Sequence, residues 1–444
     1  MAELIQQNEH LSFGLGSVAA FRIDGSKETH TQATIKAPLG KIAIWGDDNM
    51  YPERYMKVFK NNGAAGSSFR FNRAAHYGQG FKLWRMDTTD DGKEDRQIVP
   101  INSLPVISKF FKENQLQRVY NEVIADLELW NIGWPEYILS NDYNTITSVR
   151  RYQTYKMRFE VINPKSGLVE NSYFSHNWTS GLKEDSEFVQ KTPVIDSYAS
   201  AEQVKEYCKK NKIHKFMMPI FYPLIDETYY PEPEQHSVFR NGWMDVVNAI
   251  PQYKKHFSEN QLNVKYMVYI SEEYFLRTYL NEWENFTPER KQEIRKGLTT
   301  SIDEHLAGNK NAGKSIQSTV FKDKDNQWVK GIEVQPLKDE NSSEGKGLLD
   351  SSAGNSEIMS AWNVDPSLMG VGIPGGKMNS GGGSDKREAF DIVNSLFKSK
   401  RDITLQMWRF LRDYNEWDED LEGDFAITEL TTLDKNPTGT ETKF

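Results

Sequence analysis

The sequence predicts an α+β protein, in which long helices and antiparallel hairpins occupy different stretches of the chain. Three observations support this fold class. Apolar residues recur at helical spacing over 103–129 and again over 384–414. Apolar and polar residues alternate between turn residues over 130–174. A helix, a short strand and a second helix follow one another over 237–308.

The N-terminal half combines a polar arm, helices and a sheet region. Residues 1–40 are polar with scattered Thr and Gly, which is typical of an arm or loose strand that needs a partner. Residues 46–81 predict two helical segments after a turn, and residues 103–129 continue as helix with one buried face. From Trp130 the period changes to that of a hairpin-rich sheet, and residues 213–225 add one more extended run.

The stretch 237–308 has the most distinctive order of elements. Residues 237–262 are helical with an interrupting Pro251, residues 263–275 are strand-like, and residues 287–308 are helical again. A helix of about 20 residues is roughly 30 Å long, so the order predicts a projecting stalk with a β-tip. The short strand has no evident partner nearby, and we expect it to pair with a neighbouring subunit. Its alternating apolar residues are Val264, Tyr266, Val268 and Ile270.

The C-terminal third begins with a hairpin and ends in the strongest helix. Residues 315–337 predict a β-hairpin with its turn at 323–326. A loop of charged and small residues, 338–347, leads into a helix over 348–363. A second helix over 384–414 carries apolar residues along one side, and the stretch after it ends in an edge strand with a frayed tail.

Seven glycines lie between Gly370 and Gly383, just before that helix. They could cradle a phosphate, form a slack linker, or let one helix end and another begin on a crowded surface.

Composition limits the function classes. The 444 residues are enough for two or three domains, 26% of them are charged, and the net charge is −9. That balance does not indicate a tight nucleic-acid binder. The single cysteine, Cys208, excludes an internal disulfide framework and predicts an ordinary thiol. No secretory signal and no apolar run of roughly 18 residues is present, so we expect a soluble protein of cytoplasmic origin. The 11 Trp favour extensive interfaces.

Two glycine motifs match nucleotide-binding patterns by letter. "GNKNAGKS", residues 308–315, fits the phosphate-loop pattern, but a helix precedes it and strand-like alternation follows. A phosphate loop needs the reverse order, because a helix N-terminus must lie behind the phosphates. Gly370, Gly372 and Gly375 fit the dinucleotide pattern, but Pro374 lies where its helix should begin. Both motifs are interpreted as turns.

No other catalytic or metal site is indicated. The eight histidines are scattered, and none pairs with another at metal-ligand spacing beside an acidic residue. The carboxylates are abundant, but nothing singles out a catalytic pair. The sequence therefore predicts neither enzymatic activity nor a cofactor.

Four segments together suggest a family. They are "NMYPERYMKVFKNNGAAGSSFRFNRAAHYGQGF" (49–81), "LELWNIGWPEYILSNDYNTITSVRRYQTYKMRF" (127–159), the helix, strand and helix of 237–308, and "EIMSAWNVDPSLMGVG" (357–372). In this order they resemble the portal proteins of tailed bacteriophages, the head-to-tail connector family, over nearly the whole chain. The turn Asp365-Pro366-Ser367-Leu368 departs from the Gly-Val-Pro-Pro of many relatives, and little chain follows residue 418 for a large crown.

The resemblance implies a portal-like subunit with a helical and β-rich wing, a two-helix stem, a small β clip and long tunnel and wing helices. The implied parts are an N-terminal arm and wing (1–235), a first stem helix (236–262), a clip (263–286), a second stem helix (287–308), a wing hairpin with tunnel loop and tunnel helix (309–383), and a long helix with a short tail as a minimal crown (384–444).

The resemblance also implies three sets of site residues. The DNA-facing tunnel loop would contain Lys338, Asp339, Glu340, Asn341, Ser342, Ser343, Glu344 and Lys346. The clip would contact neighbouring subunits and the motor or adaptor through Val264, Tyr266, Val268, Ile270, Tyr274 and Phe275. The stem could face DNA with Lys254, Lys255, Lys291, Arg295 and Lys296. No metal site is implied.

The implied assembly is a twelve-subunit ring at one capsid vertex, through which DNA enters and later leaves. Its partners would be other copies of the chain, double-stranded DNA, the terminase large subunit, a head-to-tail adaptor, and the major capsid and scaffold proteins, with no membrane. It would lie in the virion and, during assembly, in the host cytoplasm. An acidic wall suits a conduit, because lysine and arginine contacts to phosphate would retain the duplex.

Two other functions stay open. One is a different ring-forming connector or adaptor, although adaptors are usually shorter and lack the stem, clip, stem order. The other is a nucleotide-binding enzyme that uses residues 308–315. In the portal interpretation, the glycines of 370–383 let the tunnel-side helix stop and the long helix turn back where neighbouring subunits leave little room.

Overall fold

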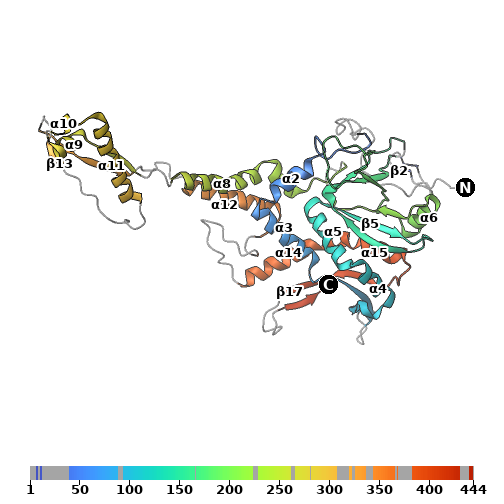
Figure 1. Ribbon diagram of the computed structural model, residues 1–444. Helices are drawn as coiled ribbons and strands as arrows, with labels where there is room; N and C mark the ends of the chain where they lie inside the picture. Colours follow the sequence, from blue (N-terminus) through green and yellow to red (C-terminus); the bar gives the residue numbers. More distant parts are fainter. Residues whose placement is uncertain are drawn as a thin grey trace. The chain divides into compact units, whose positions relative to one another are not determined.

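The computed structural model describes most of the chain: residues 7–8, 11–12, 40–88, 94–165, 167–223, 229–261, 266–280, 282–307, 320–322, 326–336, 344–365, 368, 383–430 and 440–443. It forms two compact units (Figure 1). The first unit contains Met1–Ala249 and Gly347–Phe444, and the second contains Ile250–Lys346. Both mix helices with small sheets, which confirms the predicted α+β class.

The first unit holds most of the helices, and local sequence explains where several of them begin. Asn62 caps α3 by accepting a hydrogen bond from the Ala65 amide, and Ser200 with Gln203 forms a capping box at α6. These helices are α2 (Tyr51–Phe59), α3 (Gly63–Tyr77), α4 (Pro105–Asn114), α5 (Leu116–Trp130), α6 (Ala201–Asn211), α7 (Ser237–Arg240), α14 (Gly383–Thr404) and α15 (Gln406–Tyr414), with 3-10 turns at Ile101–Ser103, Thr154–Lys156 and Glu234–His236.

Two helices belong to both units. The chain leaves the first unit within α8 (Trp243–Gln261) and returns to it within α12 (Glu344–Ala361).

The central sheet of the first unit is built around β5 (Ile132–Leu139). It pairs antiparallel with β6 (Ile146–Tyr152), β10 (Lys215–Met217) and β11 (Ile220–Phe221). Nearly every residue of β5 is buried, and α5 packs beside it in Figure 1. Gly133 lies where this packing is closest, since an added Cβ would come within 2.9 Å of Val123 Cγ1.

The first unit also contains several smaller antiparallel sheets. β16 (Glu422–Phe425), β3 (Phe81–Thr88) and β4 (Glu94–Val99) form one antiparallel sheet, so the C-terminal region pairs with a strand near the N-terminus. The remaining strands are β7 (Met157–Phe159), β8 (Asn171–Phe174) and β9 (Gln190–Pro193) in a second sheet, and the pairs β1 (Gln7–Asn8) with β2 (Leu11–Ser12) and β17 (Ile427–Leu430) with β18 (Thr440–Lys443).

Two large apolar clusters form the core of the first unit. One joins α4, α5, β5 and α15 around Phe81, Tyr120 and Trp408. The other joins α2, α5, β7 and α12 around Trp130, Trp134 and Trp362. Burying so many large aromatic side chains supplies much of the stabilisation of this unit, because each removes roughly 150–250 Å² from water.

The second unit is a small helical and β assembly. β12 (Tyr266–Ile270) pairs antiparallel with β15 (Ile332–Pro336), and β13 (Val320–Lys322) pairs with β14 (Trp328–Lys330). The helices are α9 (Glu272–Tyr279), α10 (Glu282–Asn285) and α11 (Pro288–Ala307). Asn326 has φ of +61°, as expected for the predicted hairpin turn.

Several sequence predictions are confirmed. The order helix, strand, helix over 237–308 is present as α8, β12 and α11, and the hairpin predicted over 315–337 is present as β13 and β14. Helix α8 continues through Pro251, which was predicted to interrupt it. The helices predicted over 103–129 and 384–414 are each divided, at Gln115 and at Leu405. Gln115 adopts a left-handed conformation that ends a helix.

Three predictions about the second unit were wrong in detail. The strand predicted over 263–275 ends at Ile270, and α9 begins after Ser271, whose hydroxyl caps the helix. That strand was expected to lack a partner within its chain, but it pairs with β15. The segment assigned to a wing hairpin therefore belongs, from 320 to 336, to the same compact unit as the predicted clip. Residues 308–315 and 369–382 lie outside the described residues.

Candidate functional site

The β-ribbon of β12 and β15 in the second unit is the candidate interaction surface. Val268 and Ile270 lie opposite Val334 and Ile332 in the register. The intervening Met267 and Tyr269 are 44% and 50% exposed, and the Tyr269 hydroxyl contacts the Met267 sulfur at 2.9 Å. An exposed apolar strand face is a candidate contact with another protein. The contact residues predicted on this strand are the alternate ones, Tyr266, Val268 and Ile270, and they do not include Met267 and Tyr269.

The predicted clip residues divide into three groups in the structure. Val264 lies outside the described residues, and Tyr266, Val268 and Ile270 lie on β12. Tyr274 and Phe275 lie on α9 rather than on the strand. Phe275 is 3% exposed and stacks on Trp283 with ring centroids 4.7 Å apart. Its side chain therefore belongs to the unit's own core, which removes it from the candidate contact residues.

The predicted stem cations on α11 are engaged with this aromatic core. Lys291 and Arg295 lie over the Trp283 ring at 5.6 and 5.9 Å, and Arg295 pairs with Glu272 at 2.7 Å. Cation–π contacts at exposed sites contribute about 0.5–1 kcal/mol, so both residues help to hold α11 on α9 and α10. Lys296 is exposed on α11, and Lys254 and Lys255 lie on α8.

Most of the predicted tunnel loop is not described. Residues Lys338, Asp339, Glu340, Asn341, Ser342 and Ser343 lie outside the described residues. Glu344 and Lys346 lie in the first turn of α12, which begins four residues earlier than predicted. The loop is therefore shorter than the sequence indicated.

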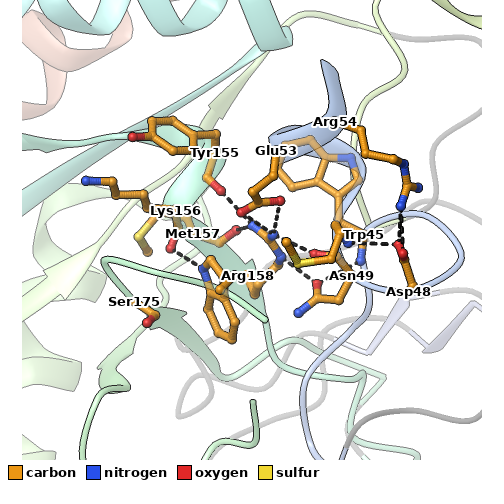
Figure 2. A network of polar contacts seen from close by, with 12 residues as sticks. Trp45, Asp48, Asn49, Glu53, Arg54, Tyr155, Lys156, Met157, Arg158 and Ser175 are labelled. Carbon is orange, nitrogen blue, oxygen red and sulfur yellow. Dashed lines mark hydrogen bonds and ion pairs between the residues drawn. The ribbon is translucent and has the colours of Figure 1, made fainter. Parts of the chain in front are cut away.

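A buried arginine organises the other notable polar site, in the first unit (Figure 2). The Arg158 side chain on β7 is fully buried. It donates to Asn49 Oδ1 at 2.5 Å, to Asn49 O and Tyr155 O at 2.8 Å, and to Met157 O at 2.9 Å. A Glu53 oxygen lies 3.3 Å from its Nη2. The guanidinium therefore ties β7 to α2 and to the loop before α2.

Electrostatics at this site are dominated by burial. Burial lowers the pKa of Arg158 against the opposing effect of Tyr230 and Glu53, and burial raises the pKa of Glu53 against the effect of Arg158. The rings of Trp178 and Trp45 lie 4.9 and 5.5 Å from the guanidinium carbon. Such an enclosed cation has no open position for a ligand, so we assign it a structural role.

A second buried network joins α3, α5 and α14. Glu128 accepts hydrogen bonds from His76 Nδ1, the Tyr222 hydroxyl and Lys400 Nζ, each at 2.8 Å. Burial alone would raise the pKa of Glu128, but Lys400 and the His76 hydrogen bond outweigh it and hold that pKa at about 2. Burial lowers the pKa of His76 despite the nearby carboxylate. The ring is therefore neutral, with Nδ1–H donating to Glu128 and Nε2 facing the Thr404 hydroxyl at 3.0 Å.

A second buried histidine, His236, is neutral as well. Its Nε2 lies 2.9 Å from the Leu129 carbonyl oxygen, which can only accept, so Nε2 carries the proton. Nδ1 then accepts from the Tyr51 hydroxyl at 2.9 Å. Burial lowers the pKa of His236 to about 3 and raises that of Tyr51 to about 12. This histidine joins the segment before α7 to α5 and α2.

The part of the chain that the structure describes contains no group of three His, Cys, Asp or Glu side chains that could hold a metal ion. Cys208 is buried on α6, and burial raises the pKa of its thiol to about 12. Within the same residues, no helix is both long and apolar enough to cross a bilayer.

The fold of this chain is similar to that of chains in several solved structures. No family model matches the chain, and no curated protein matches it. A chain from the neck of an empty GTA particle, computed with C6 symmetry, matches with a TM-score of 0.55 at 15% identity, over 90% of this chain and 87% of that chain. A chain from the neck of the native GTA particle, computed with C12 symmetry, gives a TM-score of 0.54 at 15% identity over 87% and 85%.

A third match comes from the virion of the native gene transfer agent (GTA) particle, with a TM-score of 0.53 at 14% identity over 87% of this chain and 85% of that chain. Likeness at this identity shows a shared fold. The chain thus shares its fold, over nearly its whole length, with chains in these structures of GTA particles.

Proposed function

We propose that this chain is a portal protein, a subunit of a ring-shaped conduit at one capsid vertex through which DNA is packaged and ejected. The observation that carries the proposal is the shared fold, over 90% of the chain, with a neck subunit of a GTA particle computed with C6 symmetry. The order α8, β12, α11 agrees with the stem, clip, stem order that the sequence resembles.

The proposed assembly is a homo-oligomeric ring of twelve subunits in the virion, formed in the host cytoplasm. Its proposed partners are double-stranded DNA in the channel, the terminase large subunit, a head-to-tail adaptor, and the capsid and scaffold proteins. We propose no enzymatic activity and no cofactor. The exposed Met267 and Tyr269 on β12 support a protein contact at the clip.

Electron microscopy of the purified protein, viewed down its symmetry axis, tests the proposal. The expected images are closed rings with a central channel and twelve subunits. A protein that stays monomeric at all concentrations, alone and with its capsid protein and scaffold, would contradict it.

The segment 338–347, whose last four residues lie in the first turn of α12, is proposed to line the narrowest part of the channel. Replacing Asp339, Glu340 and Glu344 with lysine is expected to slow procapsid filling several-fold at low salt, because cationic groups bind phosphates, and the effect should weaken as salt rises. Ring formation should be unchanged.

The matched control replaces three exposed acidic residues of the first unit, Asp185, Glu187 and Glu419, with lysine. It makes the same charge change outside the segment 338–347. Equal filling by the loop variant and the parent at low salt would remove this loop from the channel.

Another ring-forming connector or adaptor is the second candidate, because the matched structures are described as particle necks. Procapsids assembled with and without the chain separate the two. A portal is required for DNA filling, whereas an adaptor is required only after filling, for retention of the DNA.

A nucleotide-binding enzyme is the remaining alternative, and Lys314 tests it. In a phosphate loop this lysine contacts the β- and γ-phosphates, so Lys314→Ala would abolish binding. We expect no ATP binding by the parent in calorimetric titration and equal assembly by parent and variant. ATP binding that the substitution abolishes would favour the enzyme.

A further inference from the structure

The strand β6 lies at an edge of the central sheet, and side-chain amides cover its outer backbone groups. Among the strands that the structure describes, β6 pairs with β5 alone. An uncovered strand edge is a template for pairing with another chain, because its N–H and C=O groups lack partners. We propose that Asn114 and Asn415 are edge caps that prevent β6 from pairing with β6 of a second copy of the chain.

Asn114, the last residue of α4, covers the middle of the β6 edge. Its Oδ1 accepts a hydrogen bond from the Val149 amide at 3.0 Å, and its Nδ2 donates to the Thr147 carbonyl at 3.2 Å. The same Nδ2 also donates to the Phe110 carbonyl at 3.1 Å, which orients the amide on its own helix. A carboxamide carries the same kinds of donor and acceptor as a peptide group, so Asn114 takes the place of a residue in a neighbouring strand.

Asn415, the residue that follows α15, covers the beginning of the same edge. Its Oδ1 accepts from the Ile146 amide at 2.7 Å, and its Nδ2 donates to the Ile146 carbonyl at 3.3 Å. The neighbouring Tyr414 hydroxyl donates to the Tyr143 carbonyl at 2.9 Å. The end of α15 is therefore fixed on the turn between β5 and β6, where it can cover the first residue of β6.

The same arrangement recurs in a second sheet, at the first residue of β3. Gln117 Oε1 accepts from the Phe81 amide at 3.1 Å, and its Nε2 donates to the Phe81 carbonyl at 2.6 Å. On one side Phe81 pairs with Phe425 of β16, while on the other side the register of β4 begins only at Leu83. Gln117 thus fills the strand position that β4 leaves free, so two sheets of the first unit use a side-chain amide to complete an edge.

A second copy of the chain is the partner that the edge caps exclude. Every copy presents the same edge, and two identical strand edges can pair antiparallel about a two-fold axis. The composition of β6 favours such pairing, because Ile146, Thr147, Val149 and Tyr152 are β-branched or aromatic. A contact between two β6 edges would use the same backbone groups that Asn114 and Asn415 occupy, so capping and pairing exclude each other.

The two edge caps form at different stages of chain synthesis. Asn114 lies 33 positions before Thr147, whereas Asn415 lies 269 positions after Ile146. During synthesis the N-terminal part of a chain folds first. The beginning of β6 is therefore open until α15 docks, and a variant without the Asn415 amide reproduces that state.

The test removes both side-chain amides and keeps their approximate shape. The edge variant carries Asn114→Leu and Asn415→Leu, since leucine resembles asparagine in shape but has no donor or acceptor. The matched control carries Asn61→Leu and Asn211→Leu. Both control residues are exposed near the end of a helix, and each Nδ2 donates only to a carbonyl four residues earlier, at 3.2 Å to Lys57 and at 2.9 Å to Tyr207.

Hydrogen–deuterium exchange of the peptide 144–152, measured by mass spectrometry, reports the state of the edge. At about 1 µM the amides of Ile146 and Val149 should exchange about 3–10-fold faster in the edge variant than in the parent, because they lose their acceptors. At about 100 µM their protection should return as β6 pairs with a second copy, and the mean mass from light scattering should rise. Parent and control should agree with each other at both concentrations.

Equal exchange in parent and edge variant at the low concentration would overturn the proposal. Faster exchange with no return of protection at the high concentration would also overturn it, as would equal association of the control. Circular dichroism establishes that each variant is folded, and the single variants Asn114→Leu and Asn415→Leu carry the test if the double variant does not fold. Each comparison is made with parent and control under the same conditions, so the outcome does not depend on the portal proposal.

Discussion

Replacing Arg158 with methionine is expected to lower the free energy of unfolding by about 3–5 kcal/mol, the range for removing one partner of a buried charge network. The guanidinium is fully buried and donates to three backbone carbonyls and to the Asn49 side chain. Methionine fills a similar volume but donates nothing, so these acceptors and the Glu53 carboxylate would lose their partner.

Arg54 provides the matched control, since Figure 2 shows it beside the same network. It pairs with Asp48 at 2.6 Å, but both side chains are 46% exposed. Exposed ion pairs contribute about 0–1 kcal/mol, so Arg54→Met should change stability by no more than that. Urea unfolding followed by tryptophan fluorescence measures both variants, because Trp45 and Trp178 lie over the Arg158 guanidinium. A loss at Arg158 as small as that at Arg54 would refute the structural role.

Acidification from pH 6.5 to 4.5 is expected to remove about 2 kcal/mol of stability through His236 alone. Burial lowers the pKa of this histidine from 6.5 to about 3 in the folded state. Between these values the unfolded chain binds a proton that the folded chain does not, so stability falls as pH falls. The contribution is complete above the unfolded pKa and is lost progressively toward the folded pKa.

His236→Gln tests this assignment. Glutamine can still donate to the Leu129 carbonyl and accept from Tyr51, but it does not titrate. The slope of unfolding free energy against pH should therefore become shallower by about 1.4 kcal/mol per pH unit between 4.5 and 6. An unchanged slope in His236→Gln would contradict the prediction.

The type and order of the elements followed from local pattern. The helical periods of 103–129 and 384–414 and the alternation after Trp130 each depend on residues a few positions apart. The fold class was therefore predictable, and so was the order of α8, β12 and α11. The boundaries of the elements were less predictable. The strand predicted over 263–275 ends at Ile270, because Ser271 caps helix α9, which contains Tyr274 and Phe275. A single cap residue outweighs the alternation that follows it.

The functional surface was located only in part. The sequence selected the strand of the β-ribbon and named Tyr266, Val268 and Ile270, but it did not include Met267 and Tyr269, which are exposed. The exposure of a strand's two faces depends on which distant parts of the chain pack against them, and a local pattern does not contain that information. Met267 and Tyr269 therefore became visible only in the tertiary structure.

The sequence by itself determined the α+β class, the absence of a disulfide framework, and the resemblance to portal proteins. The tertiary structure decided which polar groups are buried and with what partners. Arg158 and Asn49 are 109 residues apart, and His236 and Leu129 are 107 apart. The sequence carries only a single arginine between two apolar residues and an ordinary histidine at these positions. Burial and the resulting pKa shifts arise from contacts between distant segments, so no local pattern could have revealed them.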